Sequence, residues 1–516
     1  MSKEIGTNGG IANSTSCDID ASDANSWQAT RRDFMRMVGA GAGAVTLASL
    51  TGCGGSNATA AVQSQALRAS LAAEEAFWID VKRLFALNPD KTFMNIGTAG
   101  SMPRRVLDYF EEANLNQARE SLNGYGSFAN ERRAIAPGFG VDPDEIVISG
   151  NTSDGMNHAI GGIDWQKGDV IITTNHEHPG GDVPMQIAAD RYGLEIVRVA
   201  LPVGTSVYLP SEGGTTTHTA QTYVNLFDKK ISEIRAQGKR VRAMVWSAPT
   251  YKTGTLLPIR KLVQLAIQRS VANDPIITVV DGAHLPGMMN LNYAEQGMDF
   301  MAGAAHKWQC GPGSTGILIV RNKVRASNTL PLPRYFPVVT SSYSTVNSAG
   351  VDWHARATGP TETYDIAATI QSCGSKHAPL IRAAAEACAM WDEMGRDKIE
   401  TYTLSLSKYL KQLIIERWGV NSLYSPDEDE LACALTSFSP FLTPSKILDR
   451  DASSGMVAAL AAKGFVVRNV NVPIGHPDAP ESADHWPLRI STHLWQSVSD
   501  IDRLVDAMWE EARNIG

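Results

Sequence analysis

The sequence has few cysteines, no excess of positive charge and no long hydrophobic run, and each absence excludes a class of protein. The six cysteines among 516 residues form no Cys-x-x-Cys pair and no Cys/His spacing typical of a metal site, so we predict no bound metal. A net charge of -8 and a pI near 5.8 argue against a broad nucleic-acid-binding surface. The composition, 43% hydrophobic and 19% charged, is that of a globular protein. We therefore expect a small molecule or a peptide as the partner.

The first 60 residues are predicted to be a polar leader followed by an export signal. Residues 1–29 are rich in Ser, Asn, Asp and Gly, a composition that does not bury enough apolar surface to fold alone. Arg31 and Arg32 then precede a run of small and apolar residues, 37–50, which is too short and too weakly hydrophobic to span a bilayer. The stretch TRRDFM resembles the twin-arginine export consensus, and LTGC resembles a lipobox in which Cys53 is acylated. We predict export to the periplasm or cell envelope by the twin-arginine machinery, and leave open whether Cys53 carries a lipid anchor.

The hydrophobic pattern divides the remaining chain into three parts. Residues 61–95 form an N-terminal segment in which the stretch 70–87 has apolar residues at helical spacing. Residues 96–384 are predicted to form a large domain. Residues 385–516 begin with helical patterns and end with strand-like ones, and so predict a small C-terminal α+β domain.

Within the large domain, short apolar runs alternate with amphipathic stretches. The runs are 145–149, 169–174, 195–201, 241–247, 276–281, 298–303 and 315–321. Strands separated by helices predict an α/β fold with a mostly parallel, doubly wound sheet. In such a sheet ligands bind at the carboxyl ends of the strands, so we expect the chemistry just after these runs.

Polar and titratable side chains follow four of the runs: Asn151, Thr152, Ser153, His178, Asp281, His284, His306 and Lys307. The first three begin a predicted helix and suit an anion, although an ordinary helix cap uses the same residue types. Asp281 ends an apolar strand, where a carboxylate is unfavourable unless a cationic group pairs with it. Lys307 taken alone would be a solvated charge entering a loop.

One cofactor, pyridoxal 5'-phosphate, uses these groups together. It needs a lysine for a Schiff base, a carboxylate against its ring nitrogen, a phosphate cradle at a helix N-terminus and a flat group stacked on its ring. Lys307, Asp281, the turn at Thr152 and Ser153, and His178 match these needs in that order. The set therefore predicts a pyridoxal-phosphate enzyme with Lys307, Asp281 and His178 as its catalytic residues.

Residues 90–330 resemble the class V aminotransferase family of fold type I pyridoxal-phosphate enzymes, and in particular its isopenicillin N epimerase-like branch. The motifs that carry the resemblance are DGAHLPG at 281–287 and HKWQCGPGSTG at 306–316. The resemblance implies a large cofactor-binding domain followed by a small C-terminal domain. It also implies that His306 belongs to the cofactor site and that His284 lies beside the ring hydroxyl. Ala304 departs from the pattern, since a serine often stands three residues before the lysine in related enzymes.

Two further motifs extend the resemblance towards the C-terminus. The segment GPTETYD at 359–365 is similar to one that reaches the phosphate of the neighbouring protomer, which implies a homodimer. Pro360 interrupts this segment, so whether Thr361 or Thr358 makes the contact stays open. Near the end, LRIST resembles the closing Arg-x-Ser motif, in which Arg489 would hold the substrate carboxylate with a bidentate fork.

The resemblance leaves several activities open. A cysteine desulfurase of this family carries a nucleophilic cysteine shortly before the closing motif, and no cysteine follows Cys433 here. What remains is chemistry at the α-carbon of an amino acid or peptide-derived substrate. We predict amino transfer, with epimerisation or elimination as alternatives. A non-catalytic envelope protein that keeps the fold to bind a ligand is the alternative from another class, and the intact Lys307, Asp281, His306 and Arg489 count against it.

Overall fold

The structure is a computed structural model that describes residues 57–203, 206–209, 214–271, 274–341, 365–475 and 483–515. The predicted export signal, with Arg31, Arg32 and Cys53, lies outside the described residues, as do Thr358 and Thr361. Within the described ranges, no helix is long and apolar enough to cross a membrane.

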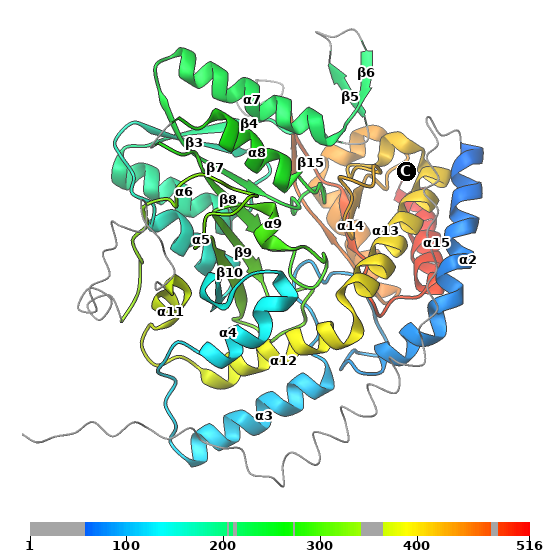
Figure 1. The fold of residues 1–516 in the computed structure, drawn as a ribbon. Coiled ribbons are helices and arrows are strands. Elements are labelled where there is room, and N and C mark those ends of the chain that lie inside the picture. Colours follow the sequence, from blue (N-terminus) through cyan, green and yellow to red (C-terminus); the bar gives the residue numbers. More distant parts are fainter. Residues whose placement is uncertain are drawn as a thin grey trace, which may run out of the picture. The chain divides into compact units, whose positions relative to one another are not determined.

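A seven-stranded sheet forms the centre of the predicted large domain (Figure 1). Its strands, in spatial order, are β2 (Ile146–Ser149), β10 (Gly316–Val320), β9 (Phe300–Ala304), β8 (Ile277–Gly282), β7 (Arg240–Ser247), β3 (Asp169–Thr174) and β4 (Glu195–Val199). Strand β10 runs antiparallel to both of its neighbours, and the other adjacent pairs are parallel. The predicted α/β fold with a mostly parallel sheet is therefore confirmed.

Helices cover both faces of the sheet, and every residue of its strands β3, β8, β9 and β10 is buried. Successive side chains of a strand point to opposite faces. In β7, Met244 and Trp246 belong to one buried cluster with residues of α7 (Ala220–Ala236) and α8 (Ile259–Arg269). Ala243 and Val245 belong to a second cluster with α5 (Thr152–Gly161), α6 (Pro179–Tyr192) and α11 (Ile366–Gln371).

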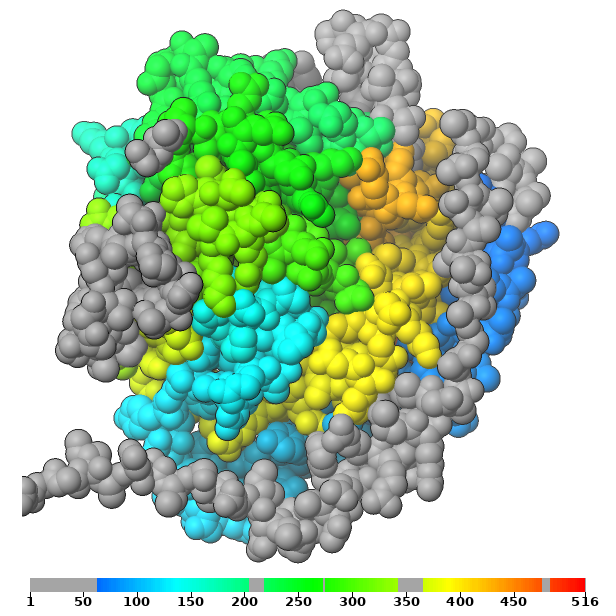
Figure 2. All heavy atoms as spheres, viewed as in Figure 1, coloured from blue at the N-terminus to red at the C-terminus, as the bar shows by residue number. Residues whose placement is uncertain are grey.

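The N-terminal helix packs against the C-terminal part of the chain. Helix α2 (Asn57–Lys82) lies along α13 (Arg396–Trp418), and the Trp78 ring stacks on Tyr402 with 4.4 Å between the ring centroids. Strand β1 (Thr92–Phe93) then pairs in parallel with β12 (Phe465–Val466). The space-filling view shows α12 (Ala378–Met394) and α13 (yellow) between the strand-bearing part (green) and α2 (blue) (Figure 2).

A second, antiparallel sheet lies in the C-terminal part and has the strand order β11 (Leu435–Phe438), β16 (Leu488–Ser491) and β13 (Arg468–Asn469). Helices α13, α14 (Arg450–Ala462) and α15 (Val498–Ile515) accompany it. Helix α12 (Ala378–Met394) runs across residue 384, so the division of the chain at that residue stays a prediction.

Candidate active site

A cavity of about 810 Å³ opens where the carboxyl ends of the parallel strands meet β13 and β16. The predicted site residues that line it are Asn151, Thr152, Ser153, His178, Asp281, His284, His306, Lys307 and Arg489. Parallel strands end at one edge of a sheet, which is why residues from such distant parts of the sequence converge. Of the predicted site, Thr361 alone falls outside the described residues.

Lys307 follows β9 on the loop that leads into β10. The loop is held by the turn at Gly100, whose backbone N–H donates to the His306 carbonyl at 2.8 Å. Among the described residues, the side-chain amine of Lys307 forms no hydrogen bond or ion pair, whereas His306 Nδ1 lies 3.0 Å from the Thr315 carbonyl oxygen. Burial lowers the pKa of Lys307 to about 8, against the opposing charge of Asp281. With this pKa, roughly a tenth of its amine is neutral and nucleophilic at pH 7, and about half at pH 8.

Asp281 is a buried carboxylate at the end of β8, only 2% exposed. It accepts a hydrogen bond from the Ala283 backbone N–H at 3.1 Å and has no ion-pair partner in the described part of the chain. Burial raises its pKa, and the charge of Lys307 opposes that rise. A buried carboxylate without a bound cation is unfavourable. The position therefore suits a ligand group that brings a positive charge or a donated proton.

The N-termini of α5 and α6 lie together in the wall of the cavity that Lys307 also lines, at the place where an anion cradle was predicted. Asn151 caps α5, because its Oδ1 accepts from the Asp154 backbone N–H at 2.9 Å, so its side-chain oxygen makes the ordinary helix cap. The Thr152 hydroxyl is buried and has no hydrogen-bond partner in the described chain. Gly180, in the first turn of α6, lies directly against this turn, because a Cβ added there would lie 2.2 Å from Ser153 Oγ and would force that hydroxyl to move. An unsatisfied hydroxyl between helix N-termini fits a phosphate.

Two of the three predicted histidines, His178 and His284, are neutral at pH 7, each with a defined tautomer. His178 Nδ1 accepts from the Gly180 N–H at 3.0 Å. Partial burial in the cavity wall, together with the charge of Lys307, lowers the pKa of His178 to about 4. For His284, the Trp308 indole donates to Nδ1 at 3.1 Å and burial lowers the pKa far below its ordinary value. The proton of His284 therefore resides on Nε2, which has no partner within the described residues and is free to donate to a ligand.

Arg489 on β16 is 1% exposed and is surrounded by neutral oxygens. Its Nη1 donates to the Tyr251 carbonyl at 3.1 Å, and its Nη2 donates to Asn95 Oδ1 and Thr98 Oγ1, both at 3.3 Å. Its Nε has no hydrogen-bond partner in the described chain. Burial lowers the pKa of Arg489 to about 9, and the neighbouring charge of Arg468 adds to this effect, yet the group stays protonated at pH 7. A buried guanidinium without a carboxylate partner is suited to bind one from a ligand.

Two residues at or behind the site, Arg468 and Glu177, were not predicted from the sequence. Arg468 lines the cavity beside Arg489. Glu177, between two histidines, lies behind the cavity and is 8% exposed. Its carboxyl accepts from Ser247 Oγ at 2.6 Å and Thr174 Oγ1 at 2.5 Å, and burial raises its pKa to about 7. The isolated glutamate in the stretch NHEHPGG was the one available signal for it.

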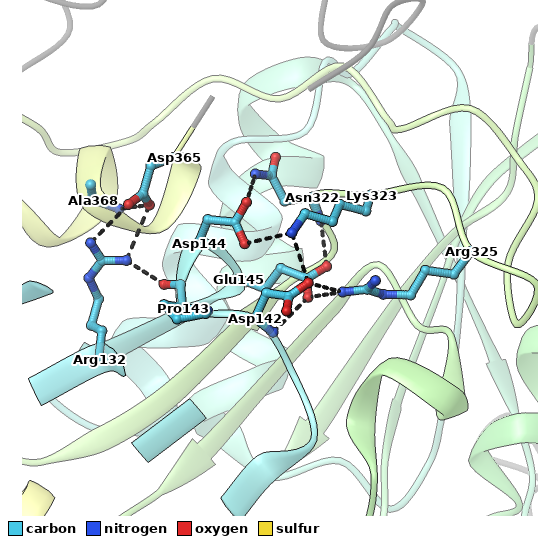
Figure 3. Close-up of polar contacts among 10 residues, drawn as sticks. All are labelled: Arg132, Asp142, Pro143, Asp144, Glu145, Asn322, Lys323, Arg325, Asp365 and Ala368. Carbon is cyan, nitrogen blue, oxygen red and sulfur yellow. Dashed lines mark hydrogen bonds and ion pairs between the residues drawn. The ribbon is translucent and has the colours of Figure 1, made fainter. Parts of the chain in front are cut away.

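The acidic residues Asp142, Asp144 and Glu145 lie close enough together to resemble a metal site in composition, but cationic side chains already neutralise them (Figure 3). Lys323 Nζ lies 2.8 Å from Asp142 and 3.4 Å from Asp144. Arg325 pairs with both Asp142 and Glu145. These ion pairs therefore connect the segment that precedes β2 with the segment that follows β10. We assign the cluster a structural role.

The chain matches the model of the family "Aminotransferase class-V" over residues 104–441, more than half of its length, and it belongs to that family. It is 24% identical to isopenicillin N epimerase of Streptomyces clavuligerus over 438 residues, which is 84% of this chain and 97% of that one. It is 23% identical to the isopenicillin N epimerase of Amycolatopsis lactamdurans, over 84% of this chain and 98% of that one.

The fold is shared with C-DES, solved as a variant with glycine covalently linked to its pyridoxal-phosphate cofactor. The two chains superimpose with a TM-score of 0.60 at 19% identity, over 83% of this chain and 99% of that one. The fold is thus that of the fold type I enzymes, as predicted. The protein is a pyridoxal 5'-phosphate-dependent enzyme of class V. Within the described residues, Asp281 has no ion-pair partner, the Thr152 hydroxyl has no hydrogen-bond partner and the Lys307 amine has neither, and all three groups fit that cofactor.

Proposed function

We propose that the protein moves a proton at the α-carbon of an amino acid or peptide-derived substrate, with Lys307 as the attachment point of the cofactor and as the base. The observation that carries this proposal is the Lys307 amine, which has a pKa of about 8 and no partner among the described residues, in a cavity that Asp281 and Arg489 also line. A base acts best when its pKa lies near the working pH.

The chain's own residues would hold the cofactor at its opposite ends. Thr152, Ser153 and the N-termini of α5 and α6 would bind the phosphate, and Asp281 would pair with the ring nitrogen. The Nε2–H of His284 would donate to the ring hydroxyl, and His178 would cover the ring. When bound, the cofactor supplies a sink for the electrons of a bond broken at the α-carbon.

Arg489 would orient the substrate by its carboxylate. Its two Nη atoms donate to neutral oxygens of Asn95, Thr98 and Tyr251. A substrate carboxylate would replace these weak acceptors and form a charge-assisted pair with the guanidinium. Its complete burial strengthens such a pair, because little water screens it. Held in this way, the substrate would expose its α-hydrogen to Lys307.

Two outcomes of this proton transfer are favoured by different observations. Two relatives that match over nearly their whole length are isopenicillin N epimerases, which favours return of the proton to the α-carbon with inversion. The amino transfer predicted from the family resemblance is the second candidate. No cysteine lies after Cys433, which leaves cysteine desulfuration without its nucleophile.

The attachment at Lys307 is tested with the purified full chain loaded with pyridoxal phosphate. We expect a visible absorption band, and borohydride reduction should leave the cofactor mass on the peptide that contains Lys307. Lys307→Ala should abolish both, while Lys229→Ala, on the exposed face of α7, should change neither. Reduction onto another lysine would refute the assignment.

The reaction type is tested by incubating candidate amino acids and small peptides with the loaded enzyme in heavy water. Epimerisation places deuterium at the α-carbon with inversion and yields no keto acid. Amino transfer bleaches the visible band and releases a keto acid, and elimination releases ammonia as well. A loaded protein that exchanges no α-deuterium with any of these substrates would instead be the non-catalytic binding protein.

Export by the twin-arginine route is a separate part of the proposal and rests on the TRRDFM stretch. Changing Arg31 and Arg32 to lysine should leave folded, cofactor-loaded protein in the cytoplasm, because the pathway recognises the guanidinium pair. Efficient export of this variant would refute the route. Cys53→Ala tests the lipid anchor, since an unchanged membrane-bound fraction would exclude it.

The homodimer also stays a proposal, resting on the GPTETYD segment. If Thr361 completes the site of the neighbouring protomer, a mixture of Lys307→Ala and Thr361→Ala chains should regain activity by forming dimers with one intact site. A fully active monomer in sedimentation experiments would refute this arrangement.

A further inference from the structure

Two arginines face each other across the small sheet beside the cavity. In the antiparallel register of β13 and β16, Arg468 is the direct partner of Arg489. Side chains of directly opposed residues lie on the same face of the sheet, with their Cβ atoms about 4.5–5.5 Å apart, and like charges in such a pair are destabilising. A fold that keeps this pair therefore carries an unfavourable interaction that a bound anion would relieve.

The described residues offer no acidic partner to either arginine. Arg468 donates from Nε to the Asn469 carbonyl at 3.1 Å and from Nη1 to Thr98 Oγ1 at 3.4 Å. The same Thr98 hydroxyl accepts from Arg489 at 3.3 Å. The two guanidinium groups thus converge on one neutral oxygen, and both line the cavity.

The cavity wall beyond Arg468 is also rich in donors. Arg450, at the start of α14, places its guanidinium carbon 5.3 Å from the centroid of the Trp486 ring, and both residues line the cavity. Asn471 lines it too, held in place by Lys252, whose Nζ donates to the Asn471 carbonyl at 2.9 Å and to its Oδ1 at 3.0 Å. This wall extends the positive surface away from Lys307 and towards the opening.

We propose that the cavity contains a second anion-binding position at Arg468, and that the substrate carries two carboxylates, one held by Arg489 and the other by Arg468 with Arg450 at the rim. The inference rests on the function proposed above, because it assigns the second end of the substrate whose first end Arg489 holds. At about 810 Å³, the cavity lies in the upper part of the usual range for ligand pockets and has room for an extended molecule beside the cofactor.

The test uses the full chain loaded with pyridoxal phosphate and three dicarboxylates, glutarate, adipate and pimelate, each compared with its monomethyl ester by calorimetry. These probes carry no amino group and so report on the arginines alone. We expect at least one dicarboxylate to bind about tenfold more tightly than its ester, as one charge-assisted contact provides. Equal binding of acid and ester for all three would overturn the proposal, without the need for any variant.

Variants then assign the position. Arg468→Gln should remove the preference for the diacid and leave ester binding within about twofold, while Arg417→Gln, an exposed arginine paired with Asp506, should keep the preference. If Arg468→Gln weakened acid and ester equally, Arg468 would merely position Arg489 for one shared carboxylate, and the proposal would be wrong. Removing a like-charged partner should not lower the melting temperature.

The same preparation separates this proposal from the preceding one. A visible band and borohydride labelling of Lys307 without a diacid preference would refute the second anion position alone. A diacid preference without the band or the labelling would refute the function proposed for Lys307 and leave the second anion position intact.

Discussion

Replacement of Glu177 by glutamine is expected to stabilise the protein, and only above mildly acidic pH. Glu177 is buried behind the site, and burial raises its pKa from 4.5 to about 7, with the charge of Asp281 contributing in the same direction. Between these two values the folded state holds a proton that the unfolded state has lost. Stability is therefore greatest below about pH 4.5 and falls as the pH rises through 7. At about 1.36 kcal/mol per pH unit, the difference corresponds to a loss of about 3 kcal/mol.

Glutamine keeps the hydrogen bonds of Glu177 and removes its titration. The amide oxygen would accept from the Ser247 N–H, now 3.2 Å from Oε1, and the amide nitrogen would donate to Ser247 Oγ, now 2.6 Å from Oε2. The hydroxyl of Thr174 would still donate to the oxygen. The substitution is therefore close to neutral at low pH, and its benefit at high pH is purely electrostatic.

The assay is denaturant-induced unfolding of the cofactor-free chain, followed by tryptophan fluorescence at pH 5 and pH 8. Relative to the native chain, Glu177→Gln should gain about 2–3 kcal/mol between these two pH values. Glu111→Gln, an exposed glutamate on α3 (Arg104–Arg119), is the control and should show no pH-dependent gain. Equal effects of Glu177→Gln at both pH values would refute the reasoning, since they would mean that Glu177 is ionised in the folded chain throughout.

Three further substitutions separate the site from the scaffold. Asp281→Asn should reduce turnover by about 10²–10³-fold, which is the usual effect of losing one preorganised electrostatic group. It should not lower the melting temperature of the cofactor-free chain. Undiminished turnover would mean that the carboxylate has only a structural role. Thr152→Val should weaken pyridoxal phosphate binding by about 1.5–3 kcal/mol but leave the binding of pyridoxal, which has no phosphate, unchanged, as measured by equilibrium dialysis. Arg321→Met should leave Asp299 as an unpaired buried carboxylate, 4% exposed, and destabilise the fold by about 3–5 kcal/mol in thermal unfolding, while cofactor binding persists at low temperature.

Much of the site was predictable because its residues follow apolar strands that end at one sheet edge. The direction of β10 was not, since a run such as GILIV is compatible with either orientation. The connection between Ala304 and Gly316 settles it, because a parallel crossover needs a longer segment that usually includes a helix. The loop that carries Lys307 is thus a short link between antiparallel strands.

Arg468 escaped prediction for a related reason. Its place in the site depends on the register that sets it opposite Arg489, and this register pairs two short strands that have β14 (Val472–Ile474) and β15 (Ala483–His485) between them in the sequence. Hydrophobic periodicity shows that a strand exists but not which residue of another strand lies beside it. Glu177 was missed because its partners Thr174 and Ser247 belong to different strands, and only the folded sheet brings them together.

The charges that face the cavity explain why its ligands should be anions. Three cationic side chains line the cavity at pH 7: Lys307, Arg468 and Arg489. Asp281 is the carboxylate that opposes them. Glu177, with its pKa near 7, is only partly ionised. Such a surplus destabilises the folded chain while the cavity contains only water, because the cations repel one another in a poorly screened space. A phosphate and the carboxylates of a substrate reverse that effect, and each adds stability according to its concentration relative to its dissociation constant. The groups that weaken the fold are therefore the same ones that give the site its affinity.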